Sequence, residues 1–196
     1  MSRIHLIRYP VATEVHYEYR RLEDDWHLVD TLTTKLVEDS SIELVLASND
    51  PKMKLVAEFI ATQLGRKQLR LGKCDVGLVV SEIFRERNLG ERRKNYGPSI
   101  YGGHGLHIAF CDDDMPGGES KSAFRQRIQE AHDRYVKPVL NQGQSVIIMG
   151  DYFWLNEYRD LKLHGAQDVK IPTLGRAVLE ANGNYIREIS IDILKW

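Results

Sequence analysis

The sequence predicts an α/β fold in which helices cover both faces of a mostly parallel central sheet, a three-layer α/β/α sandwich. Short apolar segments typical of strands alternate along the chain with amphipathic segments typical of helices. The apolar runs at 42–48 and 145–150 are almost continuous, as in strands that are buried on both faces. Near the C-terminus, Asn182-Gly183 separates two alternating runs, which is the signature of a β-hairpin.

The first half of the chain contains five expected elements. They are a strand at 4–7, a helix at 26–37, a strand at 42–48, a helix at 51–65 and a strand at 76–84. Apolar residues at helical spacing support the first helix. The second helix is expected to begin at Pro51, after the capping segment Ser48 to Asp50, and to end at Gly65.

The second half continues the alternation after a long irregular stretch. Its expected elements are a helix at 119–140, a strand at 145–150, a helix at 152–163 and a hairpin at 176–191. The glycine-rich stretch at about 85–117 is an irregular cap or insertion, and long loops of this kind are more often functional than idle. We expect residues 1–196 to form one domain.

Composition limits the classes of partner. The chain is 42% apolar and 28% charged with a net charge of −1, so its charge favours neither a nucleic acid nor a membrane surface. No apolar run approaches the roughly 18 residues of a membrane span, and the first residues lack the pattern of a secretory leader. Cys74 and Cys111 are far apart and show no metal-binding spacing. A cytoplasmic protein without a cofactor or a metal is expected.

Charged and polar residues follow four of the expected strands. They are Arg8 and Tyr9, the segment Ser48 to Lys52, the pair Glu86 and Arg87, and Asp151 with Tyr152. In α/β proteins, ligands bind at the carboxyl ends of parallel strands. These residues are therefore the candidate site.

The order of these segments resembles the histidine phosphatase superfamily, the phosphoglycerate-mutase-like proteins. The resemblance rests on "HLIRYP", "SNDPKMKLVA", "RERNLG", "PGGES" and "VIIMGDY", and it covers nearly the whole chain. It implies a phosphoglycerate-mutase-like α/β/α fold.

The same resemblance implies that the central residues have been replaced. The family's first strand ends in Arg-His-Gly, whose histidine becomes phosphorylated, whereas this chain has Arg8, Tyr9 and Pro10. Lys52 stands at a family arginine, and Asp151 stands at the second phosphate-binding histidine. Glu86 matches the family's acid residue.

These replacements disfavour the binding of a phosphate dianion. Replacing a potentially cationic histidine by Asp151 introduces a repulsion that is worth about 4 kcal/mol at ~4 Å and an effective dielectric of ~20. Lys52 lacks the two-pronged geometry of arginine, and Pro10 has no backbone N–H to donate. Ordinary phosphatase or mutase activity is therefore not expected.

Three hypotheses remain open. In the first, the protein has lost phosphoryl transfer and binds a small molecule in the former phosphate cleft, as a binding or regulatory module. In the second, it is an enzyme with new chemistry, in which Glu86 and Asp151 act as acid and base and Tyr9 takes the place of the nucleophilic histidine. In the third, a surface pairs with a second copy or another partner, as a homo-oligomer. The ligand-binding candidates are Arg8, Lys52, Ser48, Arg87 and Tyr152.

Several candidates have simpler structural interpretations. Arg8 is either an anion anchor or an ion-pair partner of Asp151 or Glu86. Tyr152, Phe153 and Trp154 form either core packing or an aromatic wall beside the pocket. His104 and His107 are expected to be loop residues rather than metal ligands, and His5 is expected to lie on a sheet face.

Overall fold

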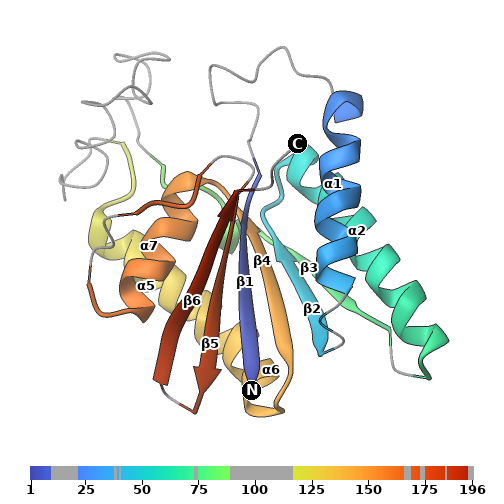
Figure 1. Cartoon of the computed structure of the whole chain (residues 1–196). Coiled ribbons are helices and arrows are strands. Elements are labelled where there is room, and N and C mark those ends of the chain that lie inside the picture. Colours follow the sequence, from blue (N-terminus) through green and yellow to red (C-terminus); the bar gives the residue numbers. More distant parts are fainter. Residues whose placement is uncertain are drawn as a thin grey trace.

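The computed structural model describes residues 1–9, 22–37, 39, 41–72, 75–88, 117–165, 169–172, 175–183 and 185–193. Within these residues, six strands form one sheet in the order β3-β2-β4-β1-β5-β6 (Figure 1). The strands are β1 (Ser2–Arg8), β2 (Ile42–Ala47), β3 (Gly77–Val80), β4 (Ser145–Gly150), β5 (Gly175–Asn182) and β6 (Tyr185–Ile193). Strands β3, β2, β4 and β1 are parallel, whereas β5 and β6 are antiparallel additions at the β1 edge.

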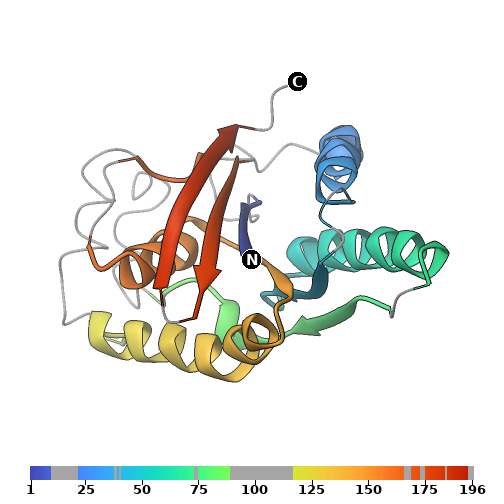
Figure 2. The same cartoon turned by 60° about the horizontal axis from the view of Figure 1, so that its bottom comes forward.

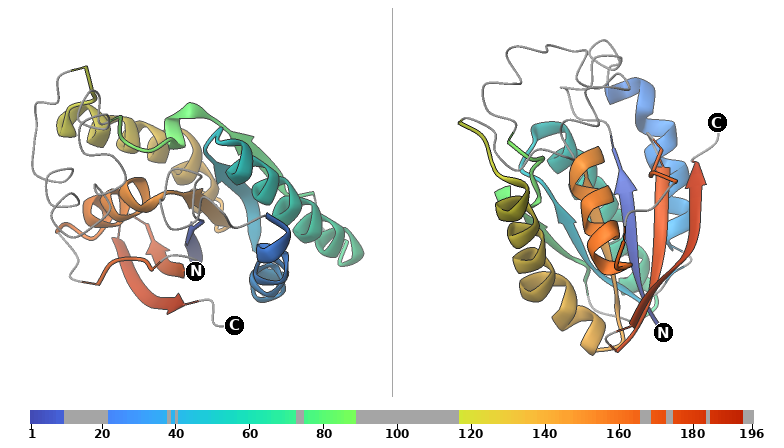
Figure 3. Two further views of the ribbon diagram at one scale, coloured as in Figure 1. Left: turned by 90° about the horizontal axis from the view of Figure 1, so that it is seen from above. Right: turned by 90° about the vertical axis from the view of Figure 1, so that its left-hand side faces the viewer.

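Helices pack on both faces of this sheet (Figure 3). On one face are α1 (Leu22–Val37) and α2 (Pro51–Arg70). On the other are α5 (Lys121–Ala131), the π-helical segment η3 (His132–Val136), α6 (Lys137–Asn141) and α7 (Tyr152–Lys162), and a short 3-10 helix η1 (Glu82–Phe84) follows β3. This arrangement confirms the three-layer, mostly parallel α/β prediction.

Alternation along β1 divides the apolar core into two parts. Ile4 and Leu6 contact the α5–α7 side, and Ile7 contacts the α1–α2 side. The predicted stripe of α1 is buried there at Val29, Leu32 and Leu36. The sheet is therefore fixed from both faces, which holds the carboxyl ends of its parallel strands in place.

The C-terminal hairpin forms as predicted, and its turn requires glycine. Gly183 has φ +61°, a conformation that L side chains rarely adopt. The turn joins β5 to β6, and the two strands pair from Asn182 and Tyr185 outward.

The predicted end of the second helix is wrong. Helix α2 continues past Gly65 to Arg70. Gly65 is buried within the helix, and a Cβ there would lie 2.1 Å from Asp75 Oδ1. The glycine therefore allows a close approach between the helix and the segment before β3, and it does not terminate the helix.

The predicted strand at 76–84 is too long. Strand β3 ends at Val80, and Ser81 caps η1 by accepting a hydrogen bond from the Ile83 N–H at 3.3 Å. A side-chain oxygen that accepts a backbone N–H competes with continued strand pairing. The long helix predicted at 119–140 is likewise divided into α5, η3 and α6, with the π-helical turn between the two α-helical parts.

Some predictions lie outside the described residues. These concern the stretch 89–116 with His104 and His107, and also Pro10, Cys74 and Cys111. Among the helices that the structure describes, none is long and apolar enough to cross a membrane.

Candidate functional site

The strand register brings the candidate segments to one edge of the sheet, at the top of Figure 1. Arg8 at the end of β1 pairs with Gly150 at the end of β4, and Ala47 at the end of β2 pairs with Met149 and Val80. Tyr9, Ser48 and Asp151 are the residues that immediately follow these strands. The ends of β1, β4, β2 and β3 therefore lie side by side in the sheet.

Arg8 is held by α7 and by the segment before β5. Its Nη1 donates a hydrogen bond to the Ile171 carbonyl at 3.1 Å, and its guanidinium carbon lies 4.5 Å from the centre of the Tyr152 ring. Burial raises the pKa of Tyr152, and the positive charge of Arg8 only partly offsets this effect. The phenol is therefore neutral at physiological pH and presents its ring face to the cation.

Asn156, which belongs to none of the sequence motifs, supports this arrangement. Its amide nitrogen donates to the Tyr152 carbonyl at 2.7 Å, and its side-chain oxygen accepts from the Ile171 N–H at 3.1 Å. Asn156 is fully buried and thereby links both residues that contact Arg8. The one signal in the sequence is a polar side chain one helical turn after Tyr152.

Tyr9 belongs to the apolar core on the α1–α2 side. Only 3% of the residue is exposed, and it lies in one cluster with Ile7, Val29 and Met53. Because side chains alternate along a strand, Arg8 points to the α7 side and Tyr9 to the opposite side. The two consecutive residues therefore have different surroundings.

Asp151 caps the helix that follows it. Its carboxylate accepts a hydrogen bond from the Trp154 N–H at 2.9 Å, and the residue is 3% exposed. A carboxylate at a helix N-terminus satisfies a free backbone donor and is also favoured by the helix dipole. Phe153 and Trp154 are core residues, and Tyr152 is the half-buried member of the aromatic group.

The segment after β2 begins a helix as predicted. The Asp50 carboxylate accepts from the Lys52 N–H at 3.0 Å and from the Met53 N–H at 3.2 Å, and Pro51 takes the first helical position. Ser48 is buried and accepts a long hydrogen bond from the Asp50 N–H at 3.4 Å. Lys52 is half-buried beside this turn.

Glu86 and Arg87 follow η1, and the Arg127 side chain of α5 binds backbone carbonyls of this segment. Arg127 Nη1 donates to the carbonyls of Ile83 and Arg85 at 2.8 and 2.9 Å, and its Nη2 donates to that of Glu86 at 3.3 Å. The Trp154 indole donates to the Ile83 carbonyl at 3.0 Å, which joins this segment to the Asp151 cap. Arg127 was not predicted, because nothing local in the sequence pairs it with carbonyls about 40 residues away.

Glu119, in the predicted "PGGES" segment, completes this arrangement. Its carboxylate accepts from Arg127 Nε and Nη2, both at 2.7 Å. Its backbone N–H donates to the Asn88 carbonyl at 2.7 Å, and its carbonyl accepts from Nε of buried Arg87 at 3.0 Å. Partial burial alone would raise the pKa of Glu119, but the hydrogen bonds and charge of Arg127 outweigh it and lower that pKa. We call Glu119, Arg127 and the three carbonyls the Arg127 clamp.

Metal ligation has no support in the described ranges. No group of three histidine, cysteine or acidic side chains lies together there in a way that would hold an ion.

The comparisons with known proteins come from structure alone. No protein-family model matches the sequence, and no curated protein matches it. The similar structures include a phosphoglycerate mutase from Bacillus anthracis at 12% identity, with a TM-score of 0.70 over 96% of this chain and 92% of that one. They also include an α-ribazole phosphatase from Shigella flexneri at 17% identity, with a TM-score of 0.60 over 95% and 94%. A mycobacterial glucosyl-3-phosphoglycerate phosphatase is 15% identical, with a TM-score of 0.62 over 98% of both chains.

The chain has the phosphoglycerate-mutase-like fold. At these identities the similarity establishes the architecture and not the activity. The fold implied by the sequence motifs is confirmed, and the roles of Tyr9, Glu86 and Asp151 stay predictions.

Proposed function

We propose that this chain is a member of the histidine phosphatase superfamily that has lost phosphoryl transfer and binds a small molecule at the strand ends, as a binding or regulatory module. The observation that carries the proposal is the placement of the two residues at the expected histidine positions. Tyr9 is 3% exposed in the apolar core, and the Asp151 carboxylate caps α7.

A nucleophile needs access to phosphorus and a base that removes its proton. A phenol that packs in a core cluster with Ile7 and Met53 lacks this access. Asp151 places a negative charge where incoming phosphate oxygens would need a donor, and its oxygen already accepts from Trp154. Both features disfavour transfer through a phosphorylated side chain.

The residues nearby favour a neutral or cationic ligand. Tyr152 and half-buried Glu86 supply an aromatic face and a carboxylate, and buried Asp151 adds a second negative charge. Arg8 Nη1 already donates to the Ile171 carbonyl, and the guanidinium lies over the Tyr152 ring. A ligand with a single polar group, rather than a dianion, fits this balance of charges.

Turnover of p-nitrophenyl phosphate and a panel of phosphate esters tests the proposal. We expect no release of product above that of a heat-treated sample. Turnover that Tyr9→Phe or Asp151→Asn abolishes, in variants with unchanged thermal unfolding, would contradict it. Phosphate and vanadate should also protect the protein little against thermal unfolding.

A second candidate function is an enzyme that uses Glu86 as an acid or base. The Arg127 clamp favours it, because a catalytic side chain benefits from a rigid backbone. Turnover that survives Tyr9→Phe but is lost in Glu86→Gln would support this candidate over the first. Glu82→Gln, at an exposed residue of η1, is the matched control.

A further inference from the structure

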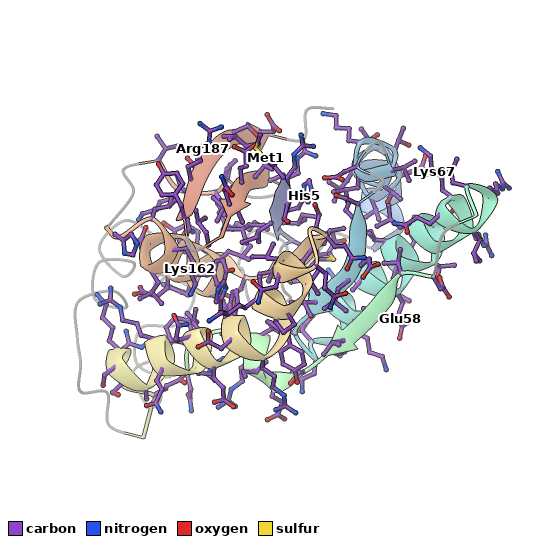
Figure 4. The ribbon with its side chains drawn as sticks, turned by 90° about the horizontal axis from the view of Figure 1, so that it is seen from below. Met1, His5, Glu58, Lys67, Lys162 and Arg187 are labelled. Carbon is purple, nitrogen blue, oxygen red and sulfur yellow. The ribbon has the colours of Figure 1, made fainter. Side chains whose placement is uncertain are left out.

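A cavity of about 530 Å³ lies on the other side of β1, away from Arg8 and Tyr152. It is lined by Arg3, His5, Lys35, Asp39, Arg176, Val178, Ile189, Ser190 and Asp192. Figure 2 shows β1 between the β5–β6 hairpin and α1, and Figure 4 labels His5 on this strand. The cavity is large enough for a metabolite-sized molecule.

The strand register explains why polar residues gather there. His5 pairs with Val178, Val178 with Ser190, and Arg176 with Asp192, so these side chains share one face of the sheet. The opposite face of β5 contributes Ala177 and Leu179 to the apolar core. His5 is thus a sheet-face histidine, as predicted, but it is 3% exposed and faces polar neighbours.

The two carboxylates of the cavity already have cationic partners. Asp39 accepts from His5 Nε2 at 3.1 Å and from Arg3 at 3.5 Å, and Asp192 accepts from Arg176 Nη2 at 2.8 Å. Partial burial would raise the pKa of Asp39, but hydrogen bonds from His5 and Ser41 lower it well below its usual range. Asp39 is therefore ionised and occupied at physiological pH.

The atoms of the lining residues that lack a hydrogen-bond partner within the described residues are two side-chain nitrogens. His5 Nδ1 and Arg176 Nε are buried, and neither has a hydrogen-bond partner among the described residues. Arg176 Nε is always a donor. Because His5 Nε2 contacts the Asp39 carboxylate, Nδ1 is the remaining position of the ring. Exposed Lys35 adds a cation at the edge, so Arg3, Lys35 and Arg176 face the two paired carboxylates.

We propose that this cavity is a second ligand site, which binds the oxyanion group of a small molecule, a phosphate or a carboxylate. Arg176 and His5 line the position of the oxyanion, and Lys35 and Arg3 attract it. The site is independent of the proposed function at the strand ends, because none of the residues that line it belongs to that region.

Titration with inorganic phosphate, followed by backbone amide NMR, tests this site. Shifts should gather at His5, Val178 and Ser190 and be absent at Arg8 and Gly150. Arg176→Lys keeps the charge and removes Nε, and it should weaken phosphate binding on the order of tenfold, because a hydrogen bond to a charged group is lost. Lys35→Gln should weaken binding less and reduce its salt dependence.

The matched control is Arg187→Lys. Arg187, labelled in Figure 4, lies on the same hairpin. It is ion-paired to Glu180 opposite it and is not among the residues that line the cavity. This variant should bind phosphate like the unmodified protein.

Three outcomes would overturn the proposal. They are equal binding by Arg176→Lys and Arg187→Lys, shifts confined to the strand ends, or a phosphate-soaked crystal structure in which only water bridges His5 Nδ1 and Arg176 Nε. Circular dichroism and thermal unfolding of each variant separate lost binding from lost folding.

Discussion

The candidate residues at the ends of β1 and β4 have a different structural role from the candidate residue that follows β3. At β1 and β4, Tyr9 fills the core, Asp151 caps a helix and Arg8 stacks on Tyr152, so the side chains themselves hold the fold together. After β3, residues of distant α5 and α7 hold the backbone of Glu86 through the carbonyls of Ile83, Arg85 and Glu86. In the first region the candidate side chains pack, cap or stack within the fold, and in the second the backbone of the candidate is held by residues of distant helices.

The difference has a consequence for stability. Residues that fill the core, cap a helix or hold a backbone segment are replaced only at a cost in stability. Substitutions at Tyr9 and at Arg127 should therefore lower stability, each through a different part of the fold. Substitutions at each region test this contrast.

The largest expected effect is that of Tyr9→Ala. Removing a nearly buried aromatic ring leaves a cavity in the α1–α2 core, so the free energy of unfolding should fall by about 3–5 kcal/mol. Urea unfolding measures it. Tyr185→Ala, at a residue 67% exposed, is the control and should change stability by about 0.5 kcal/mol or less. A loss below about 1 kcal/mol for Tyr9→Ala would mean that the ring is not a core element.

Arg127→Met should destabilise the protein by about 3 kcal/mol. It leaves the Glu119 carboxylate, which is 13% exposed, without its cation and removes a donor from three carbonyls. Chemical denaturation of this variant is compared with that of Arg134→Met, which changes an exposed arginine on η3. Equal midpoints for the two variants would show that the Arg127 clamp carries no stability.

The same clamp predicts an effect of pH. The pKa of Glu119 is lowered from 4.5 by Arg127, so the folded state holds its proton less tightly than the unfolded chain. This contribution is present above pH 4.5 and is lost as the pH falls through the lowered pKa of the folded state. The loss of stability below pH 4.5 should be smaller in Arg127→Met than in the unmodified protein. Parallel acid profiles would contradict the assignment.

Local patterns explain which parts of the fold were predictable. The apolar run of β4, the Asp50-Pro51 helix start and the Asn182-Gly183 turn are decided within a few residues, and all three are confirmed. Gly65 was interpreted incorrectly, because its role depends on the approach of Asp75 and not on its helical neighbours.

In the candidate site, too, only the features that local sequence decides could be predicted. The strand ends could be placed from the sequence, because parallel strands align their carboxyl ends. The burial of Tyr9 depends on the face toward which it points, and the partners of Arg127 are distant carbonyls. Neither leaves a local pattern in the sequence.

Asn156→Ala should cost about 1–3 kcal/mol and loosen the support of Arg8. It leaves the buried Ile171 N–H without its acceptor, and Ile171 also provides the carbonyl that Arg8 contacts. Thermal unfolding gives the stability, and amide hydrogen exchange at Ile171 reports the local change. Asn141→Ala, at an exposed position, is the control. Unchanged exchange at Ile171 would show that Asn156 does not hold this segment.

The smallest change in stability is expected for substitutions of Asp151. They test whether its carboxylate serves as a helix cap or as a catalytic group. Asp151→Ala removes a helix cap and should cost about 1 kcal/mol, similar to Ser120→Ala at the start of α5, where Ser120 accepts from the Ala123 N–H at 3.1 Å. Asp151→Asn keeps the cap and should change stability by only a few tenths of a kcal/mol. Urea unfolding of the three variants under one condition measures these values. If Asp151→Asn instead stabilised the protein by more than about 1 kcal/mol, the carboxylate at this strand end would be destabilising the folded protein. Such a residue would be retained for chemistry, and the β1–β4 end would then resemble a catalytic centre more closely than the Glu86 segment does.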